Sequence, residues 1–206
     1  MVTWHIAYKR RDNNHPHNTL NVVDMQTHPY LADRVLDKET ARTFGGGFYD
    51  RPRLMHQRIV ISIHNAEGEL IGYCGRVVDH TQPRSRVPPR FAKSEVLFNM
   101  HRAAAAEDSS VVVVEAFCDR MTVHPANIRS VVALMRVVLY ERHSCTLLNR
   151  FRQVVLMLDG DVTGPTVTGR IDTMLRPRCP VYVVDLPVGT QPDQLSTEDI
   201  LNSWRH

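Results

Sequence analysis

Three acidic residues directly follow two strongly apolar segments of the chain. Glu115 follows the valines at 111–114, and Asp159 and Asp161 follow the apolar run at 154–158. An uninterrupted apolar run is typical of a strand that is buried on both faces of a parallel sheet. Ligands of open α/β sheets bind at the carboxyl ends of such strands, so we expect the three carboxylates to converge. Carboxylate oxygens suit Mg²⁺ or Mn²⁺, which predicts metal-dependent phosphate chemistry. The simpler interpretation is that polar residues merely end two buried strands.

The elements that would position these acids alternate between strand and helix from residue 111 onward. Strands are predicted at 111–115, 131–134, 154–158 and 181–186, and helices at 119–124, 139–152, 165–175 and 197–204. This alternation is typical of a parallel sheet with helices on its faces. The chain is therefore predicted to be α/β.

A smaller α+β subdomain is predicted ahead of the parallel sheet. Residues 58–64 and 69–78 read as two antiparallel strands joined by a turn at 65–68, and 99–106 reads as a helix. Two short helices at 29–34 and 37–44 precede this hairpin, and the glycines at 45–47 should end the second one. Residues 79–90, with prolines at 83, 88 and 89, read as a loop. We expect a polar arm at 1–26, this subdomain at 27–108 and the parallel-sheet domain at 109–206.

Composition places the chain among globular, non-membrane proteins. Of its 206 residues 43% are hydrophobic, which supports a substantial core. No apolar stretch reaches the ~18 residues needed to span a bilayer, and the first residues do not read as a signal peptide. The four cysteines are widely spaced, which predicts reduced thiols and neither a zinc ribbon nor a disulfide framework. A cytoplasmic location is the expectation.

The net charge of +3 is too small to identify a partner, but its distribution is uneven. Between residues 76 and 102 there are six Lys or Arg residues against two acids. This strip is a candidate phosphate-binding surface, and a solvated loop with scattered arginines is the alternative. Tyr73 and Phe98 are predicted to be core residues, and Arg58, Arg150 and Arg152 to be solvated.

The acidic pattern resembles the toprim domain, which has a Glu after one strand and Asp-x-Asp after a later one. Four further segments resemble the catalytic core of bacterial DnaG-type primases in the same order. They are residues 28–49, the strand pair ending in Gly75-Arg76, the stretch at 89–100 and the Leu-Pro…Gly…Pro-Asp segment at 186–193. The resemblance runs from about residue 27 to the end of the chain and is typical of primase-like proteins of plasmids and other mobile elements.

The resemblance implies DNA replication chemistry, namely template-directed nucleotidyl transfer for RNA primer synthesis. Glu115, Asp159 and Asp161 would then be the catalytic metal ligands for Mg²⁺ or Mn²⁺, or Glu115 the general base. Asp119 would be a further ligand or a helix cap. Arg76, Arg90 and Lys93 match basic positions of the family and would contact DNA or triphosphate.

The implied partners are a single-stranded DNA template and nucleoside triphosphates. The family's zinc-binding and helicase-binding modules have no counterpart in the resemblance, so a zinc module or helicase is expected to act in trans. Some glycines typical of the family are replaced, at Ala116 and near Arg136. A toprim nuclease and a degenerate, non-catalytic DNA-binding module are therefore the alternatives.

Overall fold

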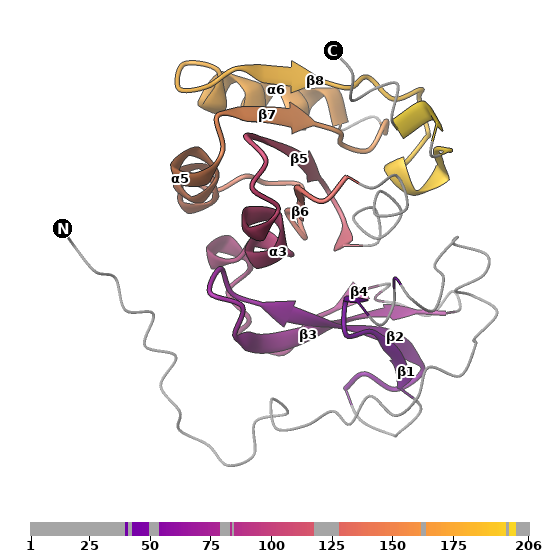
Figure 1. Cartoon of the computed structure of the whole chain (residues 1–206). Coiled ribbons are helices and arrows are strands. Elements are labelled where there is room, and N and C mark those ends of the chain that lie inside the picture. The colour runs from indigo at the N-terminus through magenta and orange to yellow at the C-terminus, as the bar shows by residue number, and fades with distance from the viewer. Residues whose placement is uncertain are drawn as a thin grey trace.

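The computed structural model describes residues 40, 43–49, 54–78, 83, 85–117, 128–161, 164–196 and 198–200. Asp119, the N-terminal arm and the helices predicted at 29–34 and 119–124 lie outside these residues. The described part contains two four-stranded sheets, one antiparallel and one parallel, and Figure 1 shows them as two layers with α3 (Met100–Ala105) between them at one side. The predicted α/β class is confirmed.

The antiparallel sheet has the order β1-β2-β3-β4. Its strands are β1 (Gly47–Tyr49), β2 (Arg58–His64), β3 (Leu70–Val77) and β4 (Ser85–Arg86). The central pair, β2 and β3, is the predicted hairpin. The prediction of a loop throughout 79–90 is wrong at β4, where Arg86 pairs with Gly75 and Ser85 with Arg76. Two polar residues give no alternating apolar pattern, so this short strand forms because β3 offers it an edge.

The predicted stop at the glycine run is confirmed at Gly45. Its φ of +58° is the left-handed conformation that glycine adopts at little cost after a helical turn. The backbone N–H of Phe44 donates to the Thr40 carbonyl at 3.1 Å in that last turn. The Ser62 hydroxyl then donates to the Gly45 carbonyl at 3.0 Å, which fixes the turn against β2.

The parallel sheet has the order β6-β5-β7-β8. Its strands are β5 (Ser110–Val114), β6 (Val131–Ala133), β7 (Gln153–Leu156) and β8 (Val181–Val183), each within one to three residues of its predicted bounds. The chain passes from β5 to β6 on one side and then crosses to β7 on the other side. The reversal point of such a sheet, here between β5 and β7, is where α/β proteins bind ligands.

The continuous valine run of β5 is explained by two different apolar layers. Val112 and Val114 pack into a cluster that contains Ile61 and Cys74 of the antiparallel sheet. Val111 and Val113 pack into a second cluster on the opposite face. Because successive side chains of a strand point to opposite faces, a strand covered on both sides must be apolar at every position.

Three helices supply the second apolar layer. They are α3, α5 (Glu141–Arg150) and α6 (Gly164–Leu175), and short 3₁₀ turns occupy η1 (Lys93–Glu95) and η3 (Pro192–Gln194). In α5 the acidic Glu141 lies in the first turn and the basic Arg150 in the last, which complements the helix dipole. No helix of the described residues is long and apolar enough to cross a bilayer.

Two burial predictions have opposite outcomes. Tyr73 and Phe98 are buried, as predicted for core residues, and Arg152 is exposed, as predicted. The prediction of a solvated arginine is wrong for Arg150, which is half-buried and donates from Nε to the Ala104 carbonyl at 3.1 Å. It is also wrong for Arg58, because only 3% of this residue is exposed. Its guanidinium Nη1 donates to the Pro83 carbonyl at 3.0 Å, so a tertiary partner compensates for burying the charged group.

Candidate active site

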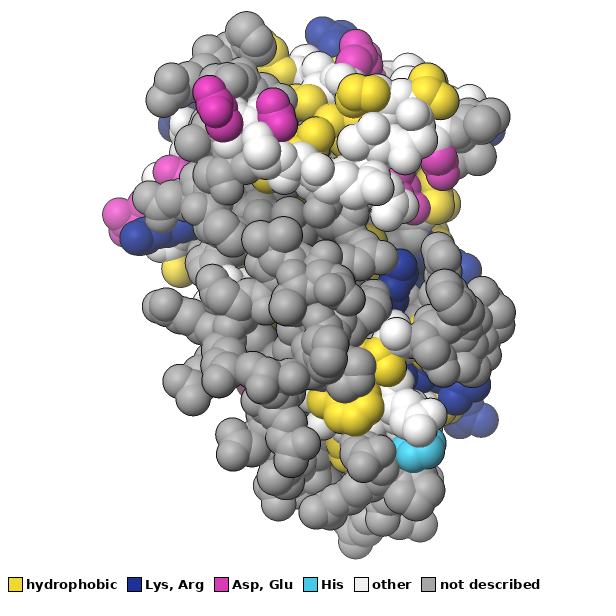
Figure 2. Space-filling view, turned by 90° about the vertical axis from the view of Figure 1, so that its right-hand side faces the viewer, with side chains coloured by type: hydrophobic (Ala, Val, Ile, Leu, Met, Phe, Trp, Pro, Cys, Tyr) yellow, Lys and Arg dark blue, Asp and Glu magenta, His cyan; other side chains and the backbone are white. Residues whose placement is uncertain are grey.

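The predicted acids lie at the reversal point of the parallel sheet. Glu115 directly follows β5, and Asp159 follows the extension of β7, whose Met157 N–H donates to the Val113 carbonyl at 3.0 Å. Two adjacent parallel strands thus deliver their carboxylates to the same edge. Figure 2 shows acidic side chains on the half of the molecule above a group of Lys and Arg side chains.

The three acids are close enough to influence one another electrostatically. Glu115 is half-buried and its pKa is raised from 4.5 to about 7, first because burial disfavours the charged form and then because Asp159 and Asp161 are negative. Asp159 is buried, with 8% of its surface exposed, whereas Asp161 is exposed. The structure therefore brings together the three residues that the sequence selects.

A loop that the sequence interpretation did not include in the site holds Asp159. The side-chain amide of Gln191 donates to Asp159 Oδ2 at 2.8 Å. The Gln191 backbone N–H in turn donates to Gln194 Oε1 at 2.7 Å, within the capping box of η3. Gln191 lies in the 186–193 segment that carries part of the family resemblance, but a Gln between Thr190 and Pro192 has no pattern that would identify it as a partner of an acid.

Gly160 allows that loop to approach the acids. Its N–H donates to the Thr190 carbonyl at 2.8 Å, and its own carbonyl accepts from the Gly189 N–H at 2.7 Å. A methyl group at this position would collide with the carbonyl oxygens of Pro187, Leu186 and Thr190. The middle residue of the Asp-x-Asp motif is therefore glycine for a steric reason, and the close contact fixes Gln191 beside Asp159.

The donor set suits a hard divalent cation, although the described residues do not form a finished metal centre. No three His, Cys, Asp or Glu side chains among them make a group that could hold a metal ion as they stand. The chemistry nonetheless fits, because the acids offer only carboxylate oxygens. A bound cation would also relieve their mutual repulsion, which after burial is the second cause of the raised pKa of Glu115. Asp119, the fourth predicted ligand, lies outside the described residues.

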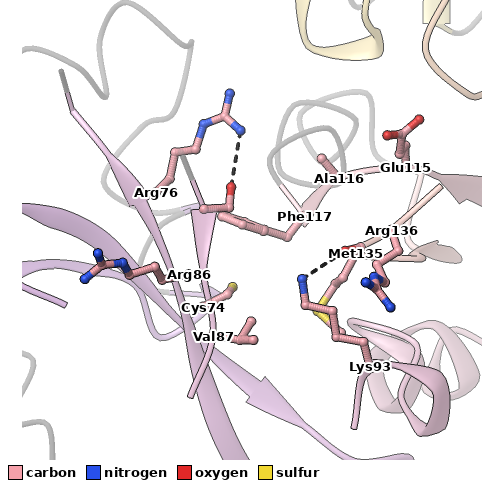
Figure 3. A pocket seen from close by; sticks show the side chains of 11 residues that line it. Cys74, Arg76, Arg86, Val87, Lys93, Glu115, Ala116, Phe117, Met135 and Arg136 are labelled. Carbon is pink, nitrogen blue, oxygen red and sulfur yellow. Dashed lines mark hydrogen bonds between the residues drawn. The ribbon is translucent and has the colours of Figure 1, made fainter. Parts of the chain in front are cut away.

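A cleft joins Glu115 to the antiparallel sheet. It is lined by Cys74, Arg76, Ser85, Arg86, Val87, Lys93, Glu115, Ala116, Phe117, Met135 and Arg136. Figure 3 shows that β3 and β4 contribute one wall and that the ends of β5 and β6, together with η1, contribute the other.

Two of the three predicted phosphate-binding cations line this cleft. Arg76 donates from Nη1 to the Ser85 hydroxyl at 3.3 Å, and Lys93 donates from Nζ to the Met135 carbonyl at 3.5 Å. Arg90 is exposed and is not among the lining residues, so the structure does not bring it to the cleft. Arg86, which belongs to the basic strip between residues 76 and 102, also lines the cleft and donates to the Leu54 carbonyl at 3.4 Å.

The backbone beside Arg136, where the sequence suggests a replaced glycine, contains one residue with an unusual conformation. Met135, the residue directly after Leu134, has a φ of +56°, the left-handed conformation that favours glycine. Arg136 itself adopts an ordinary backbone conformation, and its side chain lines the cleft. This chain therefore adopts a conformation that favours glycine at a residue that has a side chain.

Two family models match this chain, one over most of the antiparallel sheet and one over most of the parallel sheet. A family model described as "DNA primase catalytic core, N-terminal domain" matches residues 49–104, and one described as "Toprim-like" matches residues 112–196. A DNA primase of Staphylococcus aureus (strain COL) is 31% identical over 181 residues, covering 81% of this chain and 30% of the relative. The chain carries a DnaG-type primase toprim core.

Other relatives extend the agreement from sequence to fold. A DNA primase of Staphylococcus epidermidis (strain ATCC 12228 / FDA PCI 1200) is 32% identical over 152 residues, covering 71% of this chain and 25% of the relative. The Aquifex aeolicus primase structure, with zinc-binding and RNA polymerase domains, superposes with a TM-score of 0.76 at 24% identity, over 85% of this chain and 54% of that one. A DnaG primase catalytic domain bound to ssDNA gives a TM-score of 0.76 at 22% identity, over 85% of this chain and 69% of that one. The primase core spans less than a third of the curated relatives' length.

Proposed function

We propose that this primase core catalyses template-directed nucleotidyl transfer, in which a primer 3′-hydroxyl attacks the α-phosphorus of a nucleoside triphosphate and pyrophosphate leaves. The observation that carries the proposal is the shared cleft, in which Glu115 lies on one wall and Arg76 and Arg86 lie on the other. A phosphodiester reaction needs its anionic groups neutralised on one side and its reacting oxygens activated on the other. In this cleft the antiparallel sheet contributes the cations Arg76 and Arg86, and the parallel sheet contributes the acid Glu115.

Mg²⁺ or Mn²⁺, held by Glu115, Asp159 and Asp161, would supply the charge neutralisation of the attacking and leaving oxygens. The remaining tasks fall to the chain's own groups. Gln191 keeps the Asp159 carboxylate in one orientation. Glu115, whose pKa is about 7, is suited either to bind metal or to accept the proton of the attacking hydroxyl near neutral pH.

The proposed partners are a single-stranded DNA template and nucleoside triphosphates, both of which present phosphates to the basic wall. Among the solved structures with this fold, one holds a DnaG catalytic domain bound to ssDNA. A zinc-binding module or helicase acting in trans, a cytoplasmic location and an origin in a mobile element stay predictions.

A single assay distinguishes the proposed function from its alternatives. Purified full chain is incubated with single-stranded DNA, nucleoside triphosphates and Mg²⁺ or Mn²⁺, and both the RNA products and the template length are measured. New RNA whose sequence follows the template supports the proposal. Shortened DNA without RNA would instead indicate a toprim nuclease, and binding without either product would indicate a non-catalytic DNA-binding module.

A further inference from the structure

The turn that follows β6 is tied to the acidic edge of the sheet. The Leu134 N–H donates to the Val114 carbonyl at 3.1 Å, and the Met135 N–H donates to the Glu115 carbonyl at 2.9 Å. Met135 adopts a left-handed conformation that is unfavourable for a side chain other than glycine. Such a conformation persists where the surroundings hold it. The residue that directly follows it is Arg136.

Arg136 and Lys93 are neighbouring cations on the same wall of the cleft. Both line it, and Figure 3 shows their nitrogen atoms on the side of the cleft formed by Met135. Burial, and after it the positive charge of Arg136, lower the pKa of Lys93. The Lys93 ammonium nevertheless stays beside Arg136, because Nζ donates to the Met135 carbonyl at 3.5 Å.

A chain of contacts fixes these two cations relative to each other. Arg136 Nη1 donates to the Tyr140 hydroxyl at 3.2 Å, and the Tyr140 ring meets His143 edge to face at 5.4 Å between centroids. The buried His143 completes the chain, since its Nε2 lies 3.1 Å from the Lys93 carbonyl oxygen. Both cations are therefore positioned before any ligand arrives, which lowers the entropic cost of binding one.

The acids of the described residues leave this pair positively charged. Glu95, on the same 3₁₀ turn as Lys93, forms its ion pair with Arg142. Glu115 is the one acid among the lining residues. In the described part of the chain no ion pair joins an acid to Lys93 or Arg136. Two adjacent cations that form no ion pair with a described acid favour a ligand of high negative charge density.

We propose that Lys93 and Arg136 form a triphosphate-binding site, which takes the phosphates of the incoming nucleotide beside the acidic strand ends. The inference rests on the proposed function and adds Arg136 to it as a substrate-binding residue. A triphosphate fits better than template at this point, since the pair is compact and shares its wall with Glu115. A DNA strand would instead follow the row formed by Arg76 and Arg86 on the opposite wall.

The test measures binding of inorganic tripolyphosphate, ATP and a single-stranded DNA oligonucleotide to the full chain without divalent metal. Arg136→Gln should weaken tripolyphosphate and ATP about tenfold, the loss expected for one charge-assisted contact, and should leave DNA affinity unchanged. Arg136→Lys should retain most of the affinity. Arg152→Gln, which removes an exposed arginine that does not line the cleft, is the matched control and should bind all three as wild type does.

The inference is overturned if wild type does not bind tripolyphosphate, if Arg136→Gln binds it as wild type does, or if DNA and ATP affinities fall together. Where Arg136→Gln does not fold by circular dichroism, Tyr140→Phe decides the question. That variant keeps both charges, removes the hydroxyl that holds Arg136, and should weaken tripolyphosphate binding about threefold. These binding measurements need no turnover, so their outcome is independent of whether RNA synthesis is detected. If RNA is made, Arg136→Gln should raise KM for nucleotide with kcat unchanged.

Discussion

The charged side chains on the two walls of the cleft have opposite kinds of environment. On the antiparallel wall the arginines donate to neighbouring protein groups, Arg86 to the Leu54 carbonyl and Arg76 to the Ser85 hydroxyl. On the parallel wall burial, and after it the charges of Asp159 and Asp161, raise the pKa of Glu115 to about 7. The first arrangement stabilises the fold, whereas the second costs stability and is the kind that a bound ligand relieves.

This difference shows why the type of a charged residue says less about its function than its partners do. Arg58, the first residue of β2, and Arg136, which follows β6, are both arginines. Arg58 is buried and donates to the Pro83 carbonyl, and Arg136 lines the cleft beside a second cation. We expect the buried arginine to matter for stability and the cleft arginine to matter for binding.

Glu115→Gln, on the parallel wall, should lower activity and raise stability, and its effect should be the largest. Metal-dependent activity should fall about 100-fold or more, because one carboxylate contributes several kcal/mol to charge stabilisation. Stability should rise at pH 8. The folded-state pKa of Glu115 is raised from 4.5 to about 7, so its charged form is disfavoured in the fold above pH 7, and the amide removes that penalty.

Solvent screening keeps this gain at about 1–2 kcal/mol. Thermal unfolding at pH 8 and at pH 4, where the gain should vanish, is the measurement. A lower melting temperature at pH 8 would contradict the description of this wall as strained by its charges.

Arg58→Ala should show the opposite behaviour on the antiparallel wall. Removing the guanidinium leaves the Pro83 carbonyl without this donor and opens space beside Met55 and Gly75, so unfolding should become easier by about 2 kcal/mol. Activity per folded molecule should be retained. Denaturant titration measures the first effect and an activity assay well below the melting temperature measures the second. Arg152→Ala, at an exposed site, is the matched control.

Gln191→Leu tests whether the loop at 186–194 positions the metal-binding acids. Leucine is similar in size but cannot donate to Asp159 Oδ2, so Mn²⁺ should bind about tenfold more weakly, as is common when a partner of a ligand is lost. Calorimetric or spin-resonance titration with Mn²⁺ measures this without turnover. Gln194→Leu, one step further from the carboxylate, should have a smaller effect, and equal affinities in wild type and Gln191→Leu would remove Gln191 from the site.

The smallest effect is a pH dependence of stability at the junction between β2 and α3. His64 and His101 stack at 4.8 Å between ring centroids, and burial together with the charge of Arg102 lowers both pKa values, that of His101 to about 4. In the unfolded chain both should titrate near 6.5, so the unfolded state takes up protons first as pH falls. Stability should be full above pH 6.5 and decline progressively toward pH 4.

His101→Gln should flatten this decline in chemical denaturation measured across that pH range. His56→Gln, at an exposed position, should leave the profile as in wild type. A His101→Gln profile as steep as that of wild type would show that other groups cause the decline.

The sequence predicted those features that depend on local pattern. The valine run of β5, the hairpin and the acids at strand ends each follow from the order of residue types, because a doubly covered strand must be apolar and a strand end must be polar. The family resemblance further indicated which acids and cations to consider.

The features that the sequence left out all depend on tertiary neighbours. Arg58 has the residue type of a surface position, but it is buried and donates to the Pro83 carbonyl, and β4 forms because β3 presents an open edge. Gln191 becomes a partner of Asp159 only through the close contact at Gly160. The turn that carries Arg136 into the cleft has a left-handed backbone at Met135, where glycine is usual. Residue types alone therefore do not identify Arg136 as a cleft residue.

The most direct test of the central claim compares RNA synthesis by wild type and Asp159→Asn on a single-stranded DNA template with Mg²⁺ or Mn²⁺. Asparagine keeps the size of the side chain and its place beside Gln191 but removes the negative charge. We predict template-directed RNA from wild type, none from the variant, and the same far-ultraviolet circular dichroism for both. Full RNA synthesis by a folded Asp159→Asn protein would contradict the assignment of these strand-end acids as the catalytic centre.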